Sequence, residues 1–350
     1  MTGHQNNLDP LRGLAALAVL SHHLSVYTTF AVPWLSTLGG LLGVQLFFVI
    51  SGYLIVQSAS AHSLGVYFVR RAFRIYPAYW TAVLLVAACT TPLATWGAPQ
   101  EWGTYVINLL ALTHFSPAAL QRHDVLTVSW TLTVEWCWYL LAPLLVWGSR
   151  QSGSRHYWLV TGLGALAVSS LWVRLAQSGA LDPLFATAIA NGGVGPVNAF
   201  SRFAYIANAA PAQLVFFMVG VIIWRYEKNL LQMHWWLPFA VLVIGAGGAP
   251  QWNDLLGLNP SFASGLGMGA LLVLALKAPL ICWHWPHRLG QWAYPIYLLH
   301  VPILIAVFHR LQLQGLPALA MALTTLLLLS ALLHYLVEAP GNGLGRSLTD

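Results

Sequence analysis

The chain has 350 residues, of which 58% are hydrophobic and only 7% are charged, and its mean hydropathy is +0.68. A soluble domain carries about 25% charged residues, so this composition excludes an ordinary soluble protein and predicts a polytopic helical membrane protein. The net charge of +6 fits basic residues that set membrane topology and contact anionic lipids, and we expect no nucleic-acid partner. The three cysteines have neither paired nor metal-type spacing, so we expect no metal site.

Apolar runs bounded by glycine, proline and charged residues predict a single all-α domain over residues 1–350. The ten expected spans lie near residues 11–31, 38–59, 77–95, 126–148, 157–177, 205–225, 235–250, 262–279, 289–309 and 316–337. We expect about ten transmembrane helices around a central cavity, with a shorter interfacial or re-entrant helix at 101–115. The longest outer segment, residues 178–204, could cap an outward cavity or be a flexible connector.

The first expected span begins in the stretch LDPLRGLAALAVLSHHL, which contains several ionisable side chains. Arg12 and His23 are eleven residues apart, close to three helical turns, so both lie on one face about 16 Å apart along the axis. Asp9 lies three residues before Arg12 and can pair with it. Ionisable side chains inside a span are costly and indicate a functional site. We interpret His23 as a general base, with His22, or a merely packed histidine, as the alternatives.

Three arginines, Arg70, Arg71 and Arg74, follow the second expected span on the predicted cytoplasmic side. They could anchor the topology, or they could form a guanidinium clamp for phosphates, which arginine binds bidentately. Arg71 and Arg74 are three residues apart, so one helical face presents both. Pro77 is expected to start the next helix.

Glu135 and His300 lie inside the apolar runs of later spans. The Glu135 carboxylate could orient a histidine or bind an acceptor hydroxyl, or it could belong to a structural buried pair. His300 could contact the substrate or pack between helices. Glu338, at the end of the last span, is expected to be held structurally by a helix terminus and nearby basic groups.

The loops of the expected spans predict the orientation, because cytoplasmic loops are enriched in Lys and Arg. With the N-terminus inside, ten basic residues fall on cytoplasmic segments and four on or near outer segments, so we expect both termini in the cytoplasm. This arrangement favours a phosphate-containing donor that arrives from the cytosol and reacts at mid-membrane. The sequence has no Walker A loop, no GxSxG elbow and no metal-ligand pair.

A proton-coupled transporter is the rival interpretation, because buried His, Glu and Arg side chains fit a proton relay equally well. A transporter often consists of two related halves with interrupted helices, and the sequence has no such symmetry. The rival predicts no dependence on a phosphate-containing donor, which distinguishes the two interpretations.

The chain resembles the acyltransferase-3 family of bacterial integral-membrane acyltransferases. The matching motifs, in order, are LDPLRGLAALAVLSHH with Arg12 and His23 in an Arg-x10-His pattern, GVQLFFVISGYLI, RRAFRIYPAYW with Arg71 and Arg74, SWTLTVEWCWYLLAP with Glu135, YPIYLLHVPI and VEAPGNGLG. Each motif alone is loose, but their order and spacing from residue 8 to about 345 are specific. Members often have Asp where this chain has Gln45, so no role of that carboxylate is expected here.

The resemblance implies a transferase of the bacterial inner (plasma) membrane that uses acetyl-CoA or another acyl-CoA and no metal. It implies that His23 is the catalytic histidine, that Arg12 holds the donor or orients the site, and that Arg71 and Arg74 contact the CoA phosphates. The implied acceptor is a hydroxyl of a glycan or a lipid-linked sugar. Direct transfer to the oxygen and transfer through an acyl group on His23 both stay open.

Overall fold

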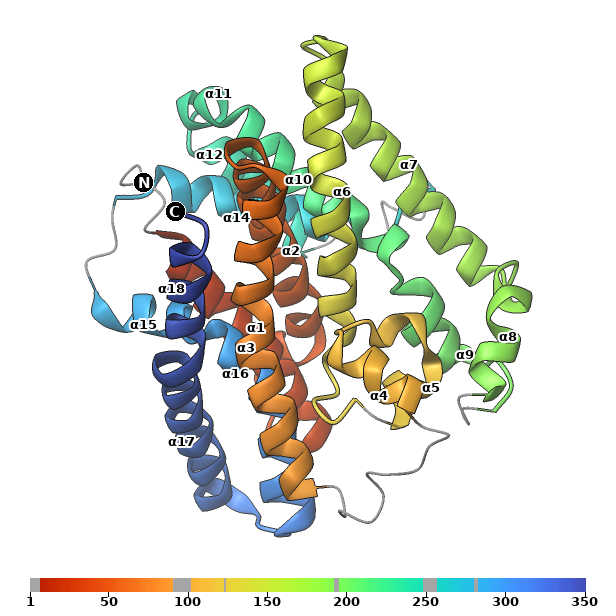
Figure 1. Cartoon of the computed structure of the whole chain (residues 1–350), viewed down its shortest axis with the longest axis vertical. Coiled ribbons are helices and arrows are strands. Elements are labelled where there is room, and N and C mark those ends of the chain that lie inside the picture. The colour runs from red at the N-terminus through yellow and green to blue at the C-terminus, as the bar shows by residue number, and fades with distance from the viewer. Residues whose placement is uncertain (1–6, 91–101, 123, 192–194, 248–256, 280–282) are drawn as a thin grey trace.

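The structure is a computed structural model of the chain, and every regular element in its described part is helical (Figure 1). It describes residues 7–90, 102–122, 124–191, 195–247, 257–279 and 283–350. The expected all-α class is therefore confirmed. Each of the ten expected spans overlaps a helix or a run of consecutive helices, although two of them end at 91–95 and 248–250, outside the described residues.

Long helices form the body of the bundle. They are α1 (Leu8–Tyr27), α2 (Leu35–Ala61), α3 (Leu64–Thr90), α6 (Trp130–Ser152), α7 (Tyr157–Gln177), α10 (Ala210–Arg225), α14 (Phe262–Lys277) and α17 (Gly315–Leu333). The shorter helices are α4 (Trp102–Leu109), α5 (Pro117–Arg122), α8 (Asp182–Asn191), α9 (Ala199–Ser201), α11 (Glu227–Gln232), α12 (Trp236–Gly247), α15 (His284–Gln291), α16 (Ala293–Leu304) and α18 (Ala339–Ser347).

Single turns of other helix types interrupt or join these helices. They are the 3-10 turn η4 (Thr113–Phe115) and the π-helical turns η5 (Arg202–Ala207), η6 (Ile305–Arg310) and η7 (His334–Glu338). Within the described residues, five helices are long and apolar enough to cross a membrane, or six if the α9–α10 pair, bent by 47°, is one span. The chain is therefore a polytopic membrane protein, while the number of ten spans stays a prediction.

Helix α3 passes through Pro77 without ending, so the expectation that Pro77 starts a helix is wrong. A proline inside a helix removes the hydrogen bond to the carbonyl four residues earlier, here that of Phe73. The C-terminal helix α18 packs against this place, since a Cβ on Gly341 would lie 3.0 Å from the Pro77 ring and 3.4 Å from the Phe73 oxygen. The arginines at 70, 71 and 74 consequently lie on one continuous helix, where each residue turns about 100° from the last.

Helix α1 runs beside α15 and α16 in the same direction. Near one end, a Cβ on Gly13 would lie 3.1 Å from the backbone nitrogen of Gly290. Ten residues further along each helix, the His23 and His300 rings are in contact. This parallel pair carries four of the predicted site residues, Asp9, Arg12 and His23 on α1 and His300 on α16.

Both described ends of the chain lie at the same end of the bundle, which we call the arginine end because it holds Arg12, Arg71 and Arg74 (Figure 1). The terminal Asp350 accepts a hydrogen bond from Arg70 of α3 at 2.6 Å. This arrangement agrees with two termini on one side of the membrane, and the identity of that side stays a prediction.

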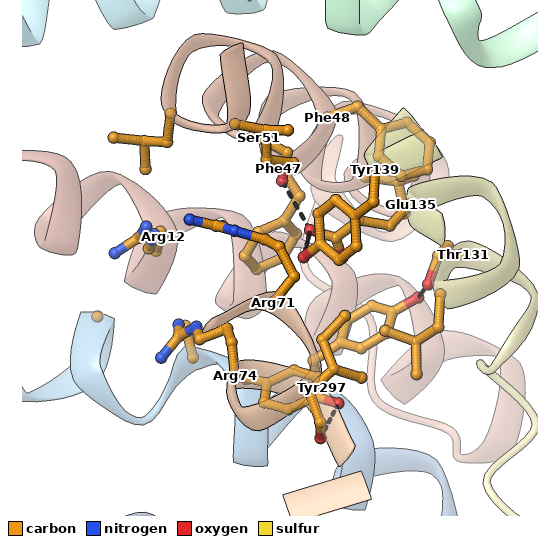
Figure 2. Close-up of a pocket in the computed structure, with 18 residues that line it drawn as sticks. Arg12, Phe47, Phe48, Ser51, Arg71, Arg74, Thr131, Glu135, Tyr139 and Tyr297 are labelled. Atoms are coloured by element: carbon orange, nitrogen blue, oxygen red, sulfur yellow. Dashed lines mark hydrogen bonds between the residues drawn. The ribbon is translucent and has the colours of Figure 1, made fainter. Parts of the chain in front are cut away.

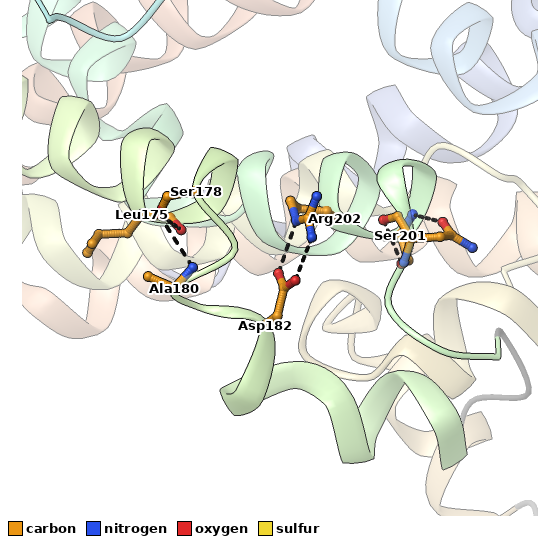
Figure 3. A network of polar contacts seen from close by, with 7 residues as sticks. Leu175, Ser178, Ala180, Asp182, Ser201 and Arg202 are labelled. Atoms are coloured by element: carbon orange, nitrogen blue, oxygen red, sulfur yellow. Dashed lines mark hydrogen bonds and ion pairs between the residues drawn. The ribbon is translucent and has the colours of Figure 1, made fainter.

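The segment 178–204 contains helix α8, so its described part is not an unstructured connector. The Arg202 Nε donates a hydrogen bond of 3.0 Å to Asp182, and a second bond joins Nη2 to the other oxygen (Figure 3). This bidentate bond lowers the pKa of the Asp182 carboxyl. Asn198 and Ser201 form a reciprocal capping box at the start of α9. The predicted helix at 101–115 corresponds to α4 and η4 from Trp102 onward.

A buried carboxyl fixes the approach to α6. Asp124 accepts hydrogen bonds from the backbone N–H of Thr127 at 3.0 Å and from the N–H and hydroxyl of Ser129 at 3.1 and 2.7 Å. Burial outweighs these bonds and raises the pKa of Asp124 to about 6. Asp124 therefore holds in place the turn that directs α6 into the bundle.

Candidate active site

A pocket with about 870 Å³ of empty space, counted out to open solvent, lies among α1, α2, α3, α6, α15 and α16. Its lining residues are Arg12, Val44, Phe47, Phe48, Ser51, Leu54, Ile55, Arg71, Arg74, Ile75, Thr131, Leu132, Glu135, Tyr139, Gly290, Ala293, Tyr294 and Tyr297. Figure 2 shows the arginines on one side and Glu135, Tyr139 and Thr131 on the other. We call this cavity the donor pocket; it brings together four of the predicted residues, Arg12, Arg71, Arg74 and Glu135.

Two of the pocket arginines already have carboxylate partners. Arg12 Nη1 donates to Asp9 Oδ1 at 3.0 Å, which is the pairing that their spacing predicts. Arg74 Nη1 donates to Glu338 Oε1 at 2.6 Å, and His334 Nδ1 lies 2.8 Å from the other Glu338 oxygen. The Glu338 side chain is fully buried, so it depends on these two partners. The expectation that basic groups hold Glu338 structurally is confirmed.

Arg71 is the pocket arginine for which the described residues supply no carboxylate partner. Its guanidinium carbon lies 5.9 Å from the Tyr67 ring centre and 5.7 Å from the Tyr139 ring centre. Its buried Nε has no hydrogen-bond acceptor among those residues. Aromatic faces stabilise a guanidinium without consuming its N–H donors. Arg71 therefore offers free donors to an anionic ligand in the pocket.

Arg70 is separated from the donor pocket, although it is adjacent to Arg71 in sequence. Its side chain contacts His62 Nε2 at 2.7 Å, Thr349 Oγ1 at 2.8 Å and Asp350 Oδ1 at 2.6 Å. One residue of rotation on a continuous helix explains the difference, because it turns the side chain by about 100°. The structure thus gives Arg70 the task of joining α3 to the C-terminal segment.

Glu135 lines the pocket opposite the arginines. Its Oε1 accepts a hydrogen bond of 2.8 Å from the Tyr139 hydroxyl and one of 3.2 Å from Ser51 Oγ. Within the described ranges no histidine is hydrogen-bonded to Glu135, so the structure does not support its predicted task of orienting one. The residues missed by sequence reasoning are Ser51 and Tyr139, and the i, i+4 spacing of Tyr139 after Glu135 was the available signal.

His23 and His300 form a hydrogen-bonded pair, with 3.1 Å between His23 Nδ1 and His300 Nε2. His300 Nδ1 lies 2.8 Å from the Tyr297 carbonyl oxygen, and His23 Nδ1 lies 3.0 Å from that of Val19. A carbonyl only accepts, so both Nδ1 atoms carry hydrogens when the rings are neutral. His23 then donates to His300 Nε2, and its own Nε2 keeps a lone pair.

This tautomer suits a general base, because the free lone pair of His23 is held in one orientation by two bonds at the other nitrogen. Among the described residues, no hydrogen-bond partner contacts His23 Nε2. His22, the alternative, points elsewhere: its Nδ1 lies 2.7 Å from the Ser36 carbonyl oxygen. The predicted substrate contact His300 is instead a direct neighbour of His23.

The histidine pair does not line the donor pocket, which ends at Tyr297. On α16 the pocket residues Ala293, Tyr294 and Tyr297 recur at helical spacing, and His300 occupies the next position of the same stripe. One turn of helix, about 4.5 Å of rise over three residues, separates Tyr297 from His300. The predicted polar face of α1 therefore contacts two separate places, with Arg12 in the pocket and His23 beyond it.

The family model described as an acyltransferase domain matches residues 5–336 of the chain. Acyltransferase MdmB of Streptomyces mycarofaciens is 25% identical, over 95% of this chain and 90% of its own length. Nodulation protein 10 of Rhizobium leguminosarum bv. viciae is 28% identical, over 87% and 84%. Peptidoglycan O-acetyltransferase OatA of Listeria monocytogenes is 26% identical over 51% of this chain and 30% of that protein. No solved structure shows significant similarity to the chain.

Proposed function

Because the chain belongs to the acyltransferase-3 family of membrane acyltransferases, we propose that it transfers an acyl group, most simply acetyl, from acyl-CoA to a hydroxyl group. The proposed acceptor is a glycan or a lipid-linked sugar. The relative OatA, by its name, acts on a glycan, peptidoglycan. We further propose that the protein lies in a bacterial inner membrane with the arginine end and both termini in the cytoplasm. The single observation that carries the donor assignment is Arg71, which has no carboxylate partner among the described residues and lies in a pocket with two further arginines.

The donor pocket suits the chemistry of CoA, which combines phosphates with a slender apolar arm. Guanidinium groups bind phosphate through paired, charge-assisted hydrogen bonds. Arg71 has free N–H donors, and Arg12 and Arg74 add positive charge at the same end of the pocket. Apolar lining residues such as Phe47, whose ring contacts Tyr297 beside the histidine pair, suit the arm that bears the thioester. With the arginines at one end of the pocket and apolar side chains beyond them, the lining supports entry of the donor from the arginine end.

His23 is the proposed catalytic base. Its Nε2 takes the proton of the acceptor hydroxyl while the oxygen attacks the thioester carbonyl, and the C–S bond then breaks. The proton passes from His23 to the leaving thiolate, so the products are the acyl ester and free CoA. His300 holds His23 in the required tautomer, as a positioning residue. Direct transfer and a transient acyl group on His23 Nε2 are both compatible with this geometry.

Glu135 is the proposed polar contact of the donor arm or acceptor hydroxyl inside the pocket. Its Oε1 is occupied by Tyr139 and Ser51, and these bonds fix the direction of the carboxylate. A fixed carboxylate at membrane depth accepts hydrogen bonds from hydroxyl or amide groups, of which the arm of CoA has several.

The test uses purified protein in lipid vesicles with radiolabelled acetyl-CoA and a crude glycan extract as acceptor. Release of free CoA and transfer of label are measured for the native protein, His23→Ala and the matched control His22→Ala. We expect native turnover, loss of at least a hundredfold in His23→Ala, and near-native turnover in His22→Ala. Circular dichroism and size-exclusion profiles establish that the variants fold.

Two outcomes would contradict the proposal. If the native protein neither binds nor turns over any acyl-CoA, the donor assignment is wrong, and proton-coupled transport becomes the hypothesis to test. If turnover survives in folded His23→Ala but is lost in His22→Ala, the donor stands and the base assignment fails.

A further inference from the structure

Tyr297 occupies the boundary between the donor pocket and the histidine pair. Its ring lines the pocket, yet it also lies 5.8 Å from the His300 ring, centre to centre. On the other side, the Tyr297 ring contacts the ring of Phe47 edge-on, with 5.9 Å between the ring centres. Phe47 lies on α2 and also lines the pocket. We call these two side chains the Tyr297 partition. Of the described aromatic residues that line the pocket, Tyr297 is the one with a ring contact to the histidine pair, and Phe47 packs against it.

The partition is held in place by polar bonds at both ends of Tyr297. Its hydroxyl lies 2.8 Å from Thr131 Oγ1 and 3.3 Å from the Val128 carbonyl oxygen, on the opposite wall formed by the start of α6. Its own carbonyl oxygen accepts from His300 Nδ1. Tyr297 therefore contacts the opposite pocket wall through its side-chain hydroxyl and supports His300 through its main-chain carbonyl.

We propose that the Tyr297 partition separates bound donor from His23 in the resting protein, and that its displacement admits the acyl group and restricts transfer to short acyl chains. This inference rests on the proposed function, because it assumes acyl-CoA in the donor pocket. It adds a specificity-determining residue, Tyr297, and its tether, Thr131, to the transfer reaction.

The size restriction follows from the thickness of the partition. About one helical turn lies between Tyr297 and His300, so the thioester carbonyl has only a few ångströms to travel. An acetyl group adds one carbon beyond that carbonyl, whereas a hexanoyl group adds five. A displaced ring that stays tethered to Thr131 leaves room for the first and not for the second. A closed partition also keeps water of the cytoplasmic side from His23, which suppresses hydrolysis of acyl-CoA to the free acid and CoA.

The first test measures acyl-chain selectivity with acetyl-, butanoyl- and hexanoyl-CoA, and the release of CoA without acceptor. We expect Tyr297→Ala to raise the hexanoyl-to-acetyl ratio of kcat/KM at least tenfold and to increase acceptor-free CoA release. Tyr297→Phe and Thr131→Val each remove only the tether, so each changes the ratio about fivefold, the weight of one neutral hydrogen bond. Their effects are less than additive in the double variant, because both remove the Tyr297–Thr131 bond, although Tyr297→Phe also loses the 3.3 Å bond to the Val128 carbonyl.

The matched control is Tyr79→Phe, which also deletes a buried tyrosine hydroxyl, bonded to the Asn108 carbonyl at 2.8 Å. Tyr79 neither lines the donor pocket nor contacts the histidine pair. We expect it to lower thermal stability about as much as Tyr297→Phe does while the chain-length ratio stays native. A structural role of Tyr297 alone would instead leave the ratio unchanged in both variants.

The second test needs no turnover and so separates this inference from the proposed function. The variant His23→Cys is made in a chain whose cysteines at 89, 137 and 282 are replaced by serine. An anionic methanethiosulfonate is added to vesicles from the side that exposes the C-terminus. We expect slow labelling with Tyr297 present and at least tenfold faster labelling with Tyr297→Ala.

Two results would overturn the proposal that these side chains form a barrier. One is a chain-length ratio in Tyr297→Ala within twofold of native while native turnover is intact. The other is labelling of His23→Cys that is already as fast with Tyr297 as with Tyr297→Ala. If native protein turns over no acyl-CoA but labelling behaves as expected, the proposed function fails and the partition stands as a barrier in the pocket.

Discussion

Replacing Arg71 by alanine tests the donor pocket most directly, because Arg71 has free donors and no carboxylate to leave behind. A hydrogen bond to a charged group contributes about 1.5–3 kcal/mol, so CoA affinity should fall roughly 10- to 150-fold. The cost to folding is small. Within the described part of the chain, Arg71→Ala loses two ring contacts, at 5.7 and 5.9 Å, each worth about 0.5–1 kcal/mol.

The assay is calorimetric titration of CoA into protein in lipid nanodiscs, at low and high salt. The native affinity should weaken as salt screens the arginine–phosphate attraction, and the salt dependence should be shallower in Arg71→Ala. Arg71→Lys should recover part of the affinity, since it keeps the charge but loses the bidentate geometry.

Arg70→Ala is the matched control, one residue away on the same helix. It loses bonds to His62, Thr349 and Asp350, none of which lines the pocket, so it should bind CoA with native affinity. The reasoning is refuted if Arg71→Ala binds CoA as tightly as the native protein, or if Arg70→Ala weakens binding by the same factor.

Three further predictions concern stability. Glu338→Gln should destabilise the protein by about 1–3 kcal/mol, because it removes the charge that Arg74 pairs with while it keeps an acceptor oxygen; thermal unfolding in detergent measures this, and an unchanged midpoint would contradict it. Gly52→Ala should also unfold the bundle at lower temperature, since a Cβ there overlaps the Phe217 backbone, and an unchanged midpoint would mean that α2 and α10 can separate at no cost. Burial raises the pKa of Asp124 from 3.8 to about 6, so the folded state binds the proton more tightly than the unfolded state does. The stability from this group is therefore present below pH 3.8 and is lost, by about 3 kcal/mol, as the pH rises to 6. Unfolding of Asp124→Asn across this range should have a flatter pH profile, and an equally steep one would assign the titration to another group.

The sequence predicted which segments form helices better than it predicted where those helices begin and end. Apolar runs located every helix that lines the donor pocket, since burial in lipid requires long uninterrupted apolar segments. The same pattern could not foresee that α3 continues through Pro77. Continuation depends on α18, whose Gly341 packs on the proline ring, and α18 lies more than 260 residues away in sequence.

The error at Pro77 is also why Arg70 and Arg71 looked equivalent. Without a defined helix start and end, the direction of Arg70 relative to the pocket could not be assigned, whereas on a continuous helix the directions of the three side chains differ by fixed angles. The spacing rule for Arg71 and Arg74 was correct because both lie on one helix in either case.

Pairings between distant helices were the other limit of sequence reasoning. The Asp9–Arg12 pair is local and followed from its spacing of three residues. The contact of His23 with His300 joins helices 277 residues apart in sequence, and no local rule specifies it. Tyr297 escaped notice for the same reason, since a tyrosine in an apolar helix gives no sign of what its hydroxyl reaches.

For the acyl-CoA donor that we propose, the carboxylates beside Arg12 and Arg74 bear on how spent CoA is released. A guanidinium that already has its counter-ion binds phosphate by exchange, so the gain is the difference between two similar attractions. If all three arginines were unpaired, the product would leave slowly and occupy the pocket between cycles. With Asp9 and Glu338 ready to take back their partners, the empty pocket is close to electrically neutral apart from Arg71 and Glu135. Such a pocket can select a phosphate-containing ligand on entry and still release the product quickly.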